Sequence, residues 1–283
     1  MKRTLRLLAV VIGCLTVLLA DTAAKDEKFK PEELVAKHLA AIGSAEARSR
    51  IKSRTVAGTT TFVLRLGGHG EGSGSANVLS DERRTRIGLK FTSLQVPGEQ
   101  LAFDGKGVSV GLIRPGERSI LSQFVHHYEV MMRDGLLGGV LSAAWGLLDV
   151  PGRQPKLTST GIKKIEGKRL HELKYQDHQG TTDLQISLYF DPQTFRHVLT
   201  QYRLVQPSGM PGAPGETPPR DTFHTIREYF DDFKEVDGLI LPHSYKLVYT
   251  IEGLNSTYLG QWSISDIKIA HNAPMEDGYF SIK

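Results

Sequence analysis

The stretch LGGHGEGSGSAN, Leu66 to Asn77, contains five glycines in twelve residues. Those at 68, 70, 72 and 74 fall on even positions, and polar residues separate them. A period of two is typical of a β-strand, because alternate side chains point to opposite faces of a sheet. A phosphate-binding loop instead needs Gly-Lys-Ser/Thr leading into a helix, and a strand-like segment follows here. The run therefore predicts a strand with one bare face rather than a nucleotide site.

The same phase continues on both sides of the run. Phe62, Leu64 and Leu66 share the parity of the glycines, and so do Ala76 and Val78. A single extended strand would place all of them on one face. A hairpin turn inside the run would break that phase, and the residues alone leave this alternative open.

Alternating apolar residues, separated by turn sequences, recur through much of the remaining chain. The pairs Asp104-Gly105 and Asp237-Gly238 lie between apolar runs, and glycine accepts the positive φ of a tight hairpin turn. Residues 223–233 fit helical spacing as well as an extended strand. The pattern predicts a mainly β protein built from antiparallel strands.

Two short helices are expected before the strands. Residues 31–42 have helical spacing, begin with a proline and two glutamates, and end before Gly43. Ser44 is placed to cap a second helix that ends near Ile51.

A longer apolar stripe at helical spacing runs from Ile120 to Leu148 and interrupts the strands. It contains glycines at 135, 138, 139 and 146, each of which weakens a helix by up to about 1 kcal/mol relative to alanine. We expect this segment to be helical but easily broken.

The composition is that of a soluble globular protein, with 40% apolar and 23% charged residues among 283. No repeat of 20 to 50 residues is present, which argues against propellers and solenoids. Residues 25–283 are expected to form a single domain. The segment 206–220, rich in proline and glycine, is expected to be an exposed loop within it.

The N-terminus has the pattern of a secretory signal. Lys2, Arg3 and Arg6 precede an apolar run of 14 residues, which is shorter than the roughly 20 that span a membrane, and small residues follow. We predict a cleaved signal peptide at 1–24 and an exported protein. The only cysteine, Cys14, lies in the apolar run, and the alternative to cleavage after residue 24 is lipoprotein anchoring at Cys14. In either case the mature chain has no disulfide.

The charge balance excludes a dedicated nucleic-acid-binding protein. Residues 1–24 hold three of the 35 Lys and Arg and one of the 31 Asp and Glu, which leaves 32 basic and 30 acidic side chains. Nucleic-acid binding requires a strongly basic stripe, and the sequence has none.

No pattern of catalytic or metal-binding residues stands out. His126 and His127 are adjacent, so on a helix they point about 100° apart and cannot share a metal ion. Acidic residues at 231, 232, 235 and 237 lack the ligand order of a calcium loop. The Gly72-Ser73-Gly74 stretch does not have the spacing of the serine hydrolase motif, Gly-x-Ser-x-Gly. The sequence predicts no enzyme, no cofactor and no metal.

Several phrases of the mature chain resemble the periplasmic outer-membrane lipoprotein-sorting proteins, the LolA-like superfamily. They are PEELVAKHLAAIG with RIKSRTVAGT, FDGKGV, FKEVDGLILPHSYKL and WSISDIKIAHNAPMEDGYFSI. The resemblance implies an unclosed antiparallel half-barrel with a helical lid on its concave face, and residues 120–148 would form that lid. The proline-rich segment and the longer chain depart from the carriers of that family.

The resemblance implies a non-catalytic, periplasmic binding or carrier protein for lipid or lipoprotein acyl chains, held in a hydrophobic cavity. The expected cavity lining consists of Leu64, Leu66, Leu188, Phe190, Tyr245, Leu247 and Tyr249. The expected lid contacts are Leu137, Val140, Leu141 and Trp145. A dry core made of the same side chains is the alternative.

Two other functions stay open at this point. An envelope sensor or scaffold could use the same fold to bind a protein partner through its sheet edges or the proline-rich loop. A hydrolase of envelope polymers would need a carboxylate pair, for which the acidic cluster near residue 231 is the candidate.

Overall fold

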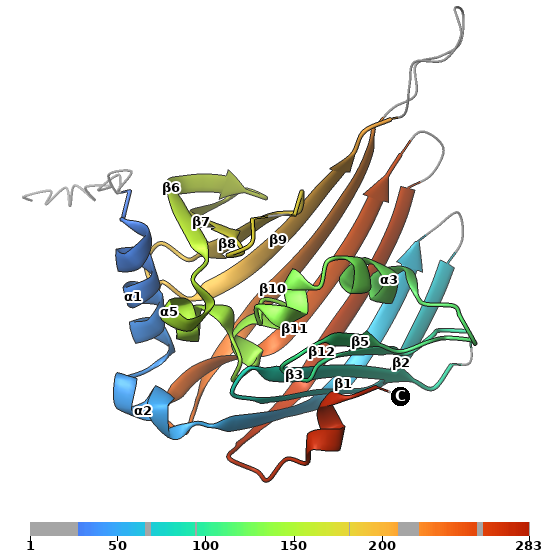
Figure 1. The fold of residues 1–283 in the computed structure, drawn as a ribbon, viewed down its shortest axis with the longest axis horizontal. Helices are drawn as coiled ribbons and strands as arrows, with labels where there is room; N and C mark the ends of the chain where they lie inside the picture. The colour runs from blue at the N-terminus through green and yellow to red at the C-terminus, as the bar shows by residue number, and fades with distance from the viewer. Residues whose placement is uncertain are drawn as a thin grey trace, which may run out of the picture.

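Twelve antiparallel strands form one sheet in the computed structural model of the chain (Figure 1). The structure describes residues 28–65, 69–93, 95–180, 182–208, 221–253 and 257–282. The strands are β1 (Ser53–Arg65), β2 (His69–Asp81), β3 (Arg84–Phe91), β4 (Glu99–Phe103), β5 (Val108–Val110), β6 (Lys156–Ile165), β7 (Lys168–Gln176), β8 (Gln185–Phe190), β9 (His197–Gln206), β10 (Thr222–Val236), β11 (Leu239–Glu252) and β12 (Thr257–His271).

The order of the strands shows where the sheet is open. Strands that follow one another along the chain pair with each other, and β1 also pairs with β12, so the order runs β5-β4-β3-β2-β1-β12-β11-β10-β9-β8-β7-β6. The pair β5 and β6 is the only sequential pair that does not meet among the described strands. The sheet is therefore an unclosed antiparallel half-barrel, as predicted.

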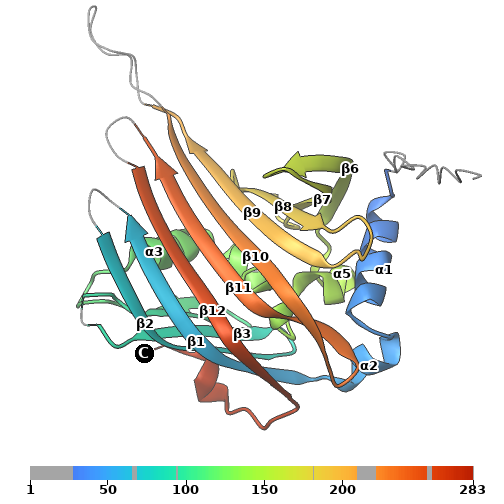
Figure 2. The ribbon, with the colours of Figure 1, turned by 180° about the vertical axis from the view of Figure 1, so that it is seen from behind.

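The chain between the two free edges, residues 111–155, lies across the concave face (Figure 1), and we call it the lid segment. It contains the helices α3 (Ile120–His127), α4 (Val130–Arg133) and α5 (Val150–Arg153), and the 3-10 turns η1 (Gly139–Leu141) and η2 (Gly146–Asp149). Figure 2 shows the convex side, where β10, β11, β12 and β1 lie in front of the lid segment.

The lid segment is helical and broken, as expected. Gly135, Gly138 and Gly139 have φ of +65°, +81° and +48°, a region that side chains other than hydrogen rarely adopt. These glycines lie between α4 and η1 and break the helix. The apolar side chains of the segment therefore lie on short helical turns rather than on one continuous helix.

The glycine run forms strand β2, but the interpretation as a single extended strand is wrong. The chain reverses between Arg65 and His69, and β1 and β2 pair as a hairpin. The parity survives the reversal because the register places Phe62 opposite Gly72 and Leu64 opposite Gly70. The turn itself, with Leu66, lies outside the described residues.

The bare face of β2 lies against the protein's own backbone. A Cβ added to Gly74 would meet the carbonyl oxygen of Lys90 at 1.8 Å, and one added to Gly72 would meet Cγ2 of Val96 at 3.0 Å. Glycine is required because β3 and the connection after it approach this closely. At Gly72 and Gly74 the protein's own chain thus occupies the space beside the bare face.

Local turn and cap signals are confirmed. Both Asp-Gly pairs form hairpin turns, with φ of +94° at Gly105 and +80° at Gly238. The α1 helix (Pro31–Ile42) begins at its proline, and Ser44 accepts a hydrogen bond from the backbone of Ala47 at the start of α2 (Ala45–Arg50). The ambiguous segment 223–233 belongs to β10.

Apolar side chains from the lid segment, α1 and the concave face form one contiguous core. The described residues include no helix that is long and apolar enough to span a bilayer. The predicted signal peptide with Cys14, and residues 209–220 of the proline-rich segment, lie outside the described residues. A 3-10 turn, η3 (Asp277–Phe280), follows the last strand.

Candidate ligand-binding site

The residues expected to line a cavity meet the lid segment on the concave face. Leu64 is half-buried. The others that the structure describes are buried in one core: Leu188, Phe190, Tyr245, Leu247 and Tyr249 from the sheet, and Leu137, Val140, Leu141 and Trp145 from the lid segment. The sheet and the lid segment thus bring the predicted residues together, with the lid side chains filling the space between.

Little open volume remains beneath the lid segment. The space beside Val140 and Trp145 measures about 20 Å³, room for about one water molecule. A groove of about 320 Å³ opens at the surface beside α3, between Phe124, Leu204 and Tyr249. An acyl chain bound beneath the lid segment, rather than in this groove, would have to displace part of the segment.

Glu228 on β10 is a buried acceptor for the lid segment. Its side chain is fully buried, and its Oε1 accepts hydrogen bonds from the backbone N–H of Gly138 (2.7 Å) and the hydroxyl of Tyr245 (2.8 Å). Its Oε2 accepts from the hydroxyl of Tyr202 (2.8 Å). None of these donors carries a charge, so burial dominates and raises the pKa of Glu228 to about 7.

Glu99 on β4 is a buried hydrogen-bond acceptor for the start of α3. Its Oε2 accepts hydrogen bonds from the hydroxyls of Ser119 (2.6 Å) and Ser122 (2.8 Å), and burial raises its pKa to about 7. Ser119 also caps α3, because its oxygen accepts from the backbone N–H of Ser122. One buried carboxylate thus positions the start of the first lid helix.

Trp145 connects the lid segment to α1. Its indole N–H donates to Nε2 of His38 over 3.0 Å, and Nδ1 of His38 lies 3.1 Å from the carbonyl oxygen of Phe195. Burial lowers the pKa of His38 to about 4, so the imidazole is neutral at pH 7. The indole also stacks on His197, with ring centroids 4.8 Å apart.

Arg54 on β1 holds the turn after the Gly138-Gly139 pair. Its guanidinium donates to the carbonyl oxygen of Val140 over 2.5 Å and to Nε2 of His271 over 3.0 Å. Nδ1 of His271 in turn lies 2.7 Å from Asp237. Burial lowers the pKa of Arg54 to about 10, which leaves it charged at neutral pH.

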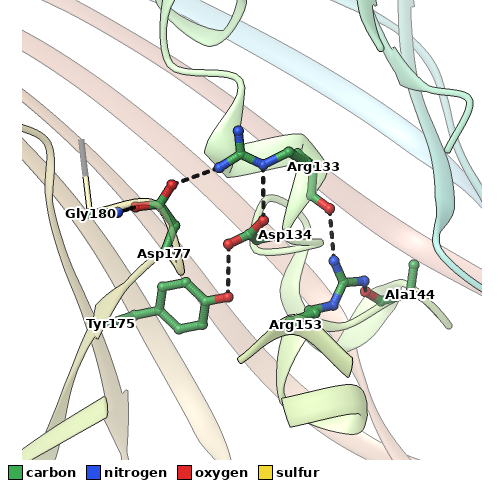
Figure 3. Close-up of polar contacts among 7 residues, drawn as sticks. All are labelled: Arg133, Asp134, Ala144, Arg153, Tyr175, Asp177 and Gly180. Carbon is green, nitrogen blue, oxygen red and sulfur yellow. Dashed lines mark hydrogen bonds and ion pairs between the residues drawn. The ribbon is translucent and has the colours of Figure 1, made fainter. Parts of the chain in front are cut away.

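An ionic cluster joins the middle of the lid segment to the end of β7 (Figure 3). Arg133 contacts Asp134 (3.2 Å) and Asp177 (2.7 Å), and the hydroxyl of Tyr175 donates to Asp134 over 2.9 Å. Burial raises the pKa of Tyr175 far above its usual range, so the hydroxyl remains a donor.

Arg153 connects α5 to the same cluster. Its guanidinium donates to the carbonyl oxygens of Arg133 (2.7 Å) and Ala144 (3.0 Å), as Figure 3 shows. The lid segment is therefore held by polar contacts at its start, its middle and its end, in addition to apolar packing.

The acidic cluster near residue 231 is exposed and lies away from the buried core beneath the lid segment. Asp231, Asp232, Glu235 and Asp237 are exposed at the β10–β11 end of the sheet. Asp232 pairs with Lys234, and Asp237 contacts His271. Within the described ranges, no group of three or more His, Cys, Asp or Glu side chains is placed to hold a metal ion.

Glu99→Gln is expected to make stability less dependent on pH. The pKa of Glu99 is raised from about 4.5 to about 7 by folding, so its contribution is full below pH 4.5 and is lost as pH rises through 7. Glutamine resembles the protonated acid. We expect the stability of the variant relative to the wild type to rise from pH 5 to pH 8, towards a limit of about 1.4 kcal/mol for each unit of pKa difference.

Urea unfolding of both proteins from pH 5 to pH 8 measures this difference. All other ionisable groups are common to both proteins, so their contributions cancel in the comparison. A difference that stays constant across this range would contradict the buried, charge-free environment of Glu99.

Comparison with known proteins gives matches among solved structures only. A scan of protein-family models and a search of the curated proteins find no match. A LolA superfamily protein from Nitrosomonas europaea is similar at 14% identity and a TM-score of 0.48, over 90% of this chain and 98% of that one. An outer membrane lipoprotein-sorting protein domain from Vibrio parahaemolyticus is similar at 10% identity and a TM-score of 0.43, over 88% and 97% of the two chains.

A DUF1329 family protein from Desulfovibrio piger is similar at 9% identity and a TM-score of 0.40, over 89% of this chain and 98% of that one. LolA-like structures are thus among the solved structures that resemble this chain, in keeping with the resemblance seen in the sequence.

Proposed function

We propose that this protein is a non-catalytic, periplasmic binding or carrier protein for the acyl chains of lipids or lipoproteins. The observation that supports this proposal is the unclosed sheet, whose two free edges are joined by a lid segment that covers the concave face. A closed barrel of the same strands would need no such connection. The lid segment belongs to no strand, so it can move while the sheet stays paired.

The side chains beneath the lid segment suit an acyl chain. Leu188, Phe190 and Leu247 are apolar and buried, and each methylene group that replaces lid contacts there contributes about 0.8 kcal/mol. A chain of about ten methylenes would supply about 8 kcal/mol. That amount is comparable with the cost of displacing part of the lid segment, so binding can be reversible.

Native mass spectrometry of the protein incubated with palmitate or a dipalmitoyl phospholipid tests the proposal. We expect a complex with one bound lipid. Leu247→Gln should weaken binding at least tenfold, because Leu247 faces the lid segment, whereas Val248→Gln on the opposite face should not. Circular dichroism of both variants checks that they fold.

A chain that binds no lipid but captures a protein partner would contradict the proposal and favour the sensor or scaffold function. Equal weakening by the two variants would place the lipid outside the concave face. Cleavage of the signal peptide is tested separately, by N-terminal sequencing of the exported protein, which is expected to begin at Lys25.

A further inference from the structure

The lid segment presents a bare main-chain amide to the centre of the concave face. Gly138 and Gly139 both have positive φ, and a Cβ added to Gly139 would lie 2.6 Å from Cζ of Phe230 and 3.2 Å from Cε1 of His197. Backbone, and not a side chain, therefore touches the sheet here. The N–H of Gly138 is the group that meets Glu228.

Glu228, Tyr202 and Tyr245 form a polar cluster on the concave face, joined by hydrogen bonds. The three side chains come from neighbouring strands, β10, β9 and β11, and all are at least 95% buried. An ionised carboxylate offers about four acceptor positions, of which the two tyrosines occupy two. The third hydrogen bond that Glu228 accepts is donated by the backbone N–H of Gly138.

Departure of the lid segment removes that third donor. A plain hydrocarbon chain in its place would leave Glu228 short of a hydrogen bond in an apolar site, which is unfavourable, whereas a ligand with an N–H group would restore the bond. His197 packs against the same glycine turn, and its buried Nδ1 has no partner among the described residues. Once the lid segment leaves, the surface under Gly138 thus contains an open acceptor position on Glu228 and the Nδ1 atom of His197, which has no hydrogen-bond partner among the described residues.

We propose that Glu228, with Tyr202 and Tyr245, is a binding subsite for the amide N–H of an N-acylated ligand. The ligand amide takes the place of the Gly138 N–H, and the acyl chain takes the place of the apolar lid side chains around it. The inference rests on the proposed function and adds that the ligand is an N-acyl compound rather than a simple ester or hydrocarbon.

A pair of ligands that differ in one group tests this subsite. N-palmitoylglycine methyl ester and O-palmitoylglycolic acid methyl ester have the same length, and only the first has an N–H. Their affinities are measured at pH 8, by competition with a fluorescent acyl probe. We expect the amide to bind about tenfold more tightly or better, the value of one hydrogen bond to a charged group.

Glu228→Met is expected to reduce the preference for the amide to about one, because it removes the acceptor and keeps the size of the side chain. Its fold is checked by circular dichroism, since three buried donors lose their partner. Glu228→Gln, which keeps a neutral acceptor oxygen, is the milder variant and should retain a reduced preference.

The outcomes separate this inference from the proposed function. Equal binding of amide and ester to the wild type overturns the subsite and leaves the acyl-chain proposal standing. A preference that survives unchanged in the folded Glu228 variants also overturns it, because the amide must then be recognised elsewhere. Binding of neither ligand overturns both.

Discussion

Trp145→Ala is expected to lower the free energy of unfolding by about 3–5 kcal/mol, the usual loss for a large aromatic side chain removed from a core. Trp145 is 1% exposed, stacks on His197 and donates to His38. Its loss removes the main contact between the lid segment and α1. Urea unfolding followed by circular dichroism measures the change.

Trp145→Phe is the matched control for this variant. It keeps an aromatic ring in the same place and loses the indole N–H, so it should cost about 1–3 kcal/mol, the penalty for leaving the buried acceptor on His38 unpaired. If Trp145→Ala costs less than Trp145→Phe, or less than about 1 kcal/mol, the lid segment does not pack on the sheet as described.

Gly139→Ala is expected to lower the free energy of unfolding by about 2–5 kcal/mol. One part, about 1–2 kcal/mol, is the cost of a positive φ for alanine. The other, about 1–3 kcal/mol, is the overpacking of a Cβ that would lie 2.6 Å from the ring of Phe230. The same substitution should loosen the lid segment and speed the uptake of a fluorescent acyl probe.

Gly116→Ala separates the two contributions. Gly116 also has positive φ, +77°, but a Cβ there would meet nothing within 4 Å. It should therefore show only the backbone cost of about 1–2 kcal/mol. Equal destabilisation by the two substitutions would mean that Gly139 does not approach the sheet closely.

Local chemistry explains which features were predictable. Asp104-Gly105 and Asp237-Gly238 determine their turns within two residues, and Ser44 caps its helix within three, so neighbours in the sequence suffice. The even parity of the glycine run also predicted the inner face of β2, although the hairpin that contains Leu66 was not resolved from the pattern.

Features that depend on distant partners were not predictable. Glu228 lies between Ile226 and Phe230, and an extended interpretation of 223–233 would have placed its carboxylate on the inner face, but helical spacing fitted equally well. Its partner Gly138 is 90 residues away. Arg54 and Val140 are 86 residues apart. Only the folded sheet brings such pairs together.

The partner of the bare face of β2 was likewise not predictable from the sequence. The pattern predicted a place of close approach, and the sequence gives no sign of what approaches. The structure places the Lys90 carbonyl against Gly74, because β3 pairs with β2 and sets Phe91 opposite Gly74.

Quenching of Trp262 by a brominated acyl chain tests most directly whether the concave face under the lid segment is the binding site. The chain has two tryptophans, so Trp145→Phe leaves Trp262 as the only emitter. Trp262 is 2% exposed and lies opposite Leu247 and Phe62 on the inner face.

Bromine quenches an indole only near contact, so a bound brominated palmitate is expected to quench Trp262, and unbrominated palmitate is not. Saturable binding of the brominated chain, shown by native mass spectrometry, with the emission of Trp262 unchanged would contradict the account.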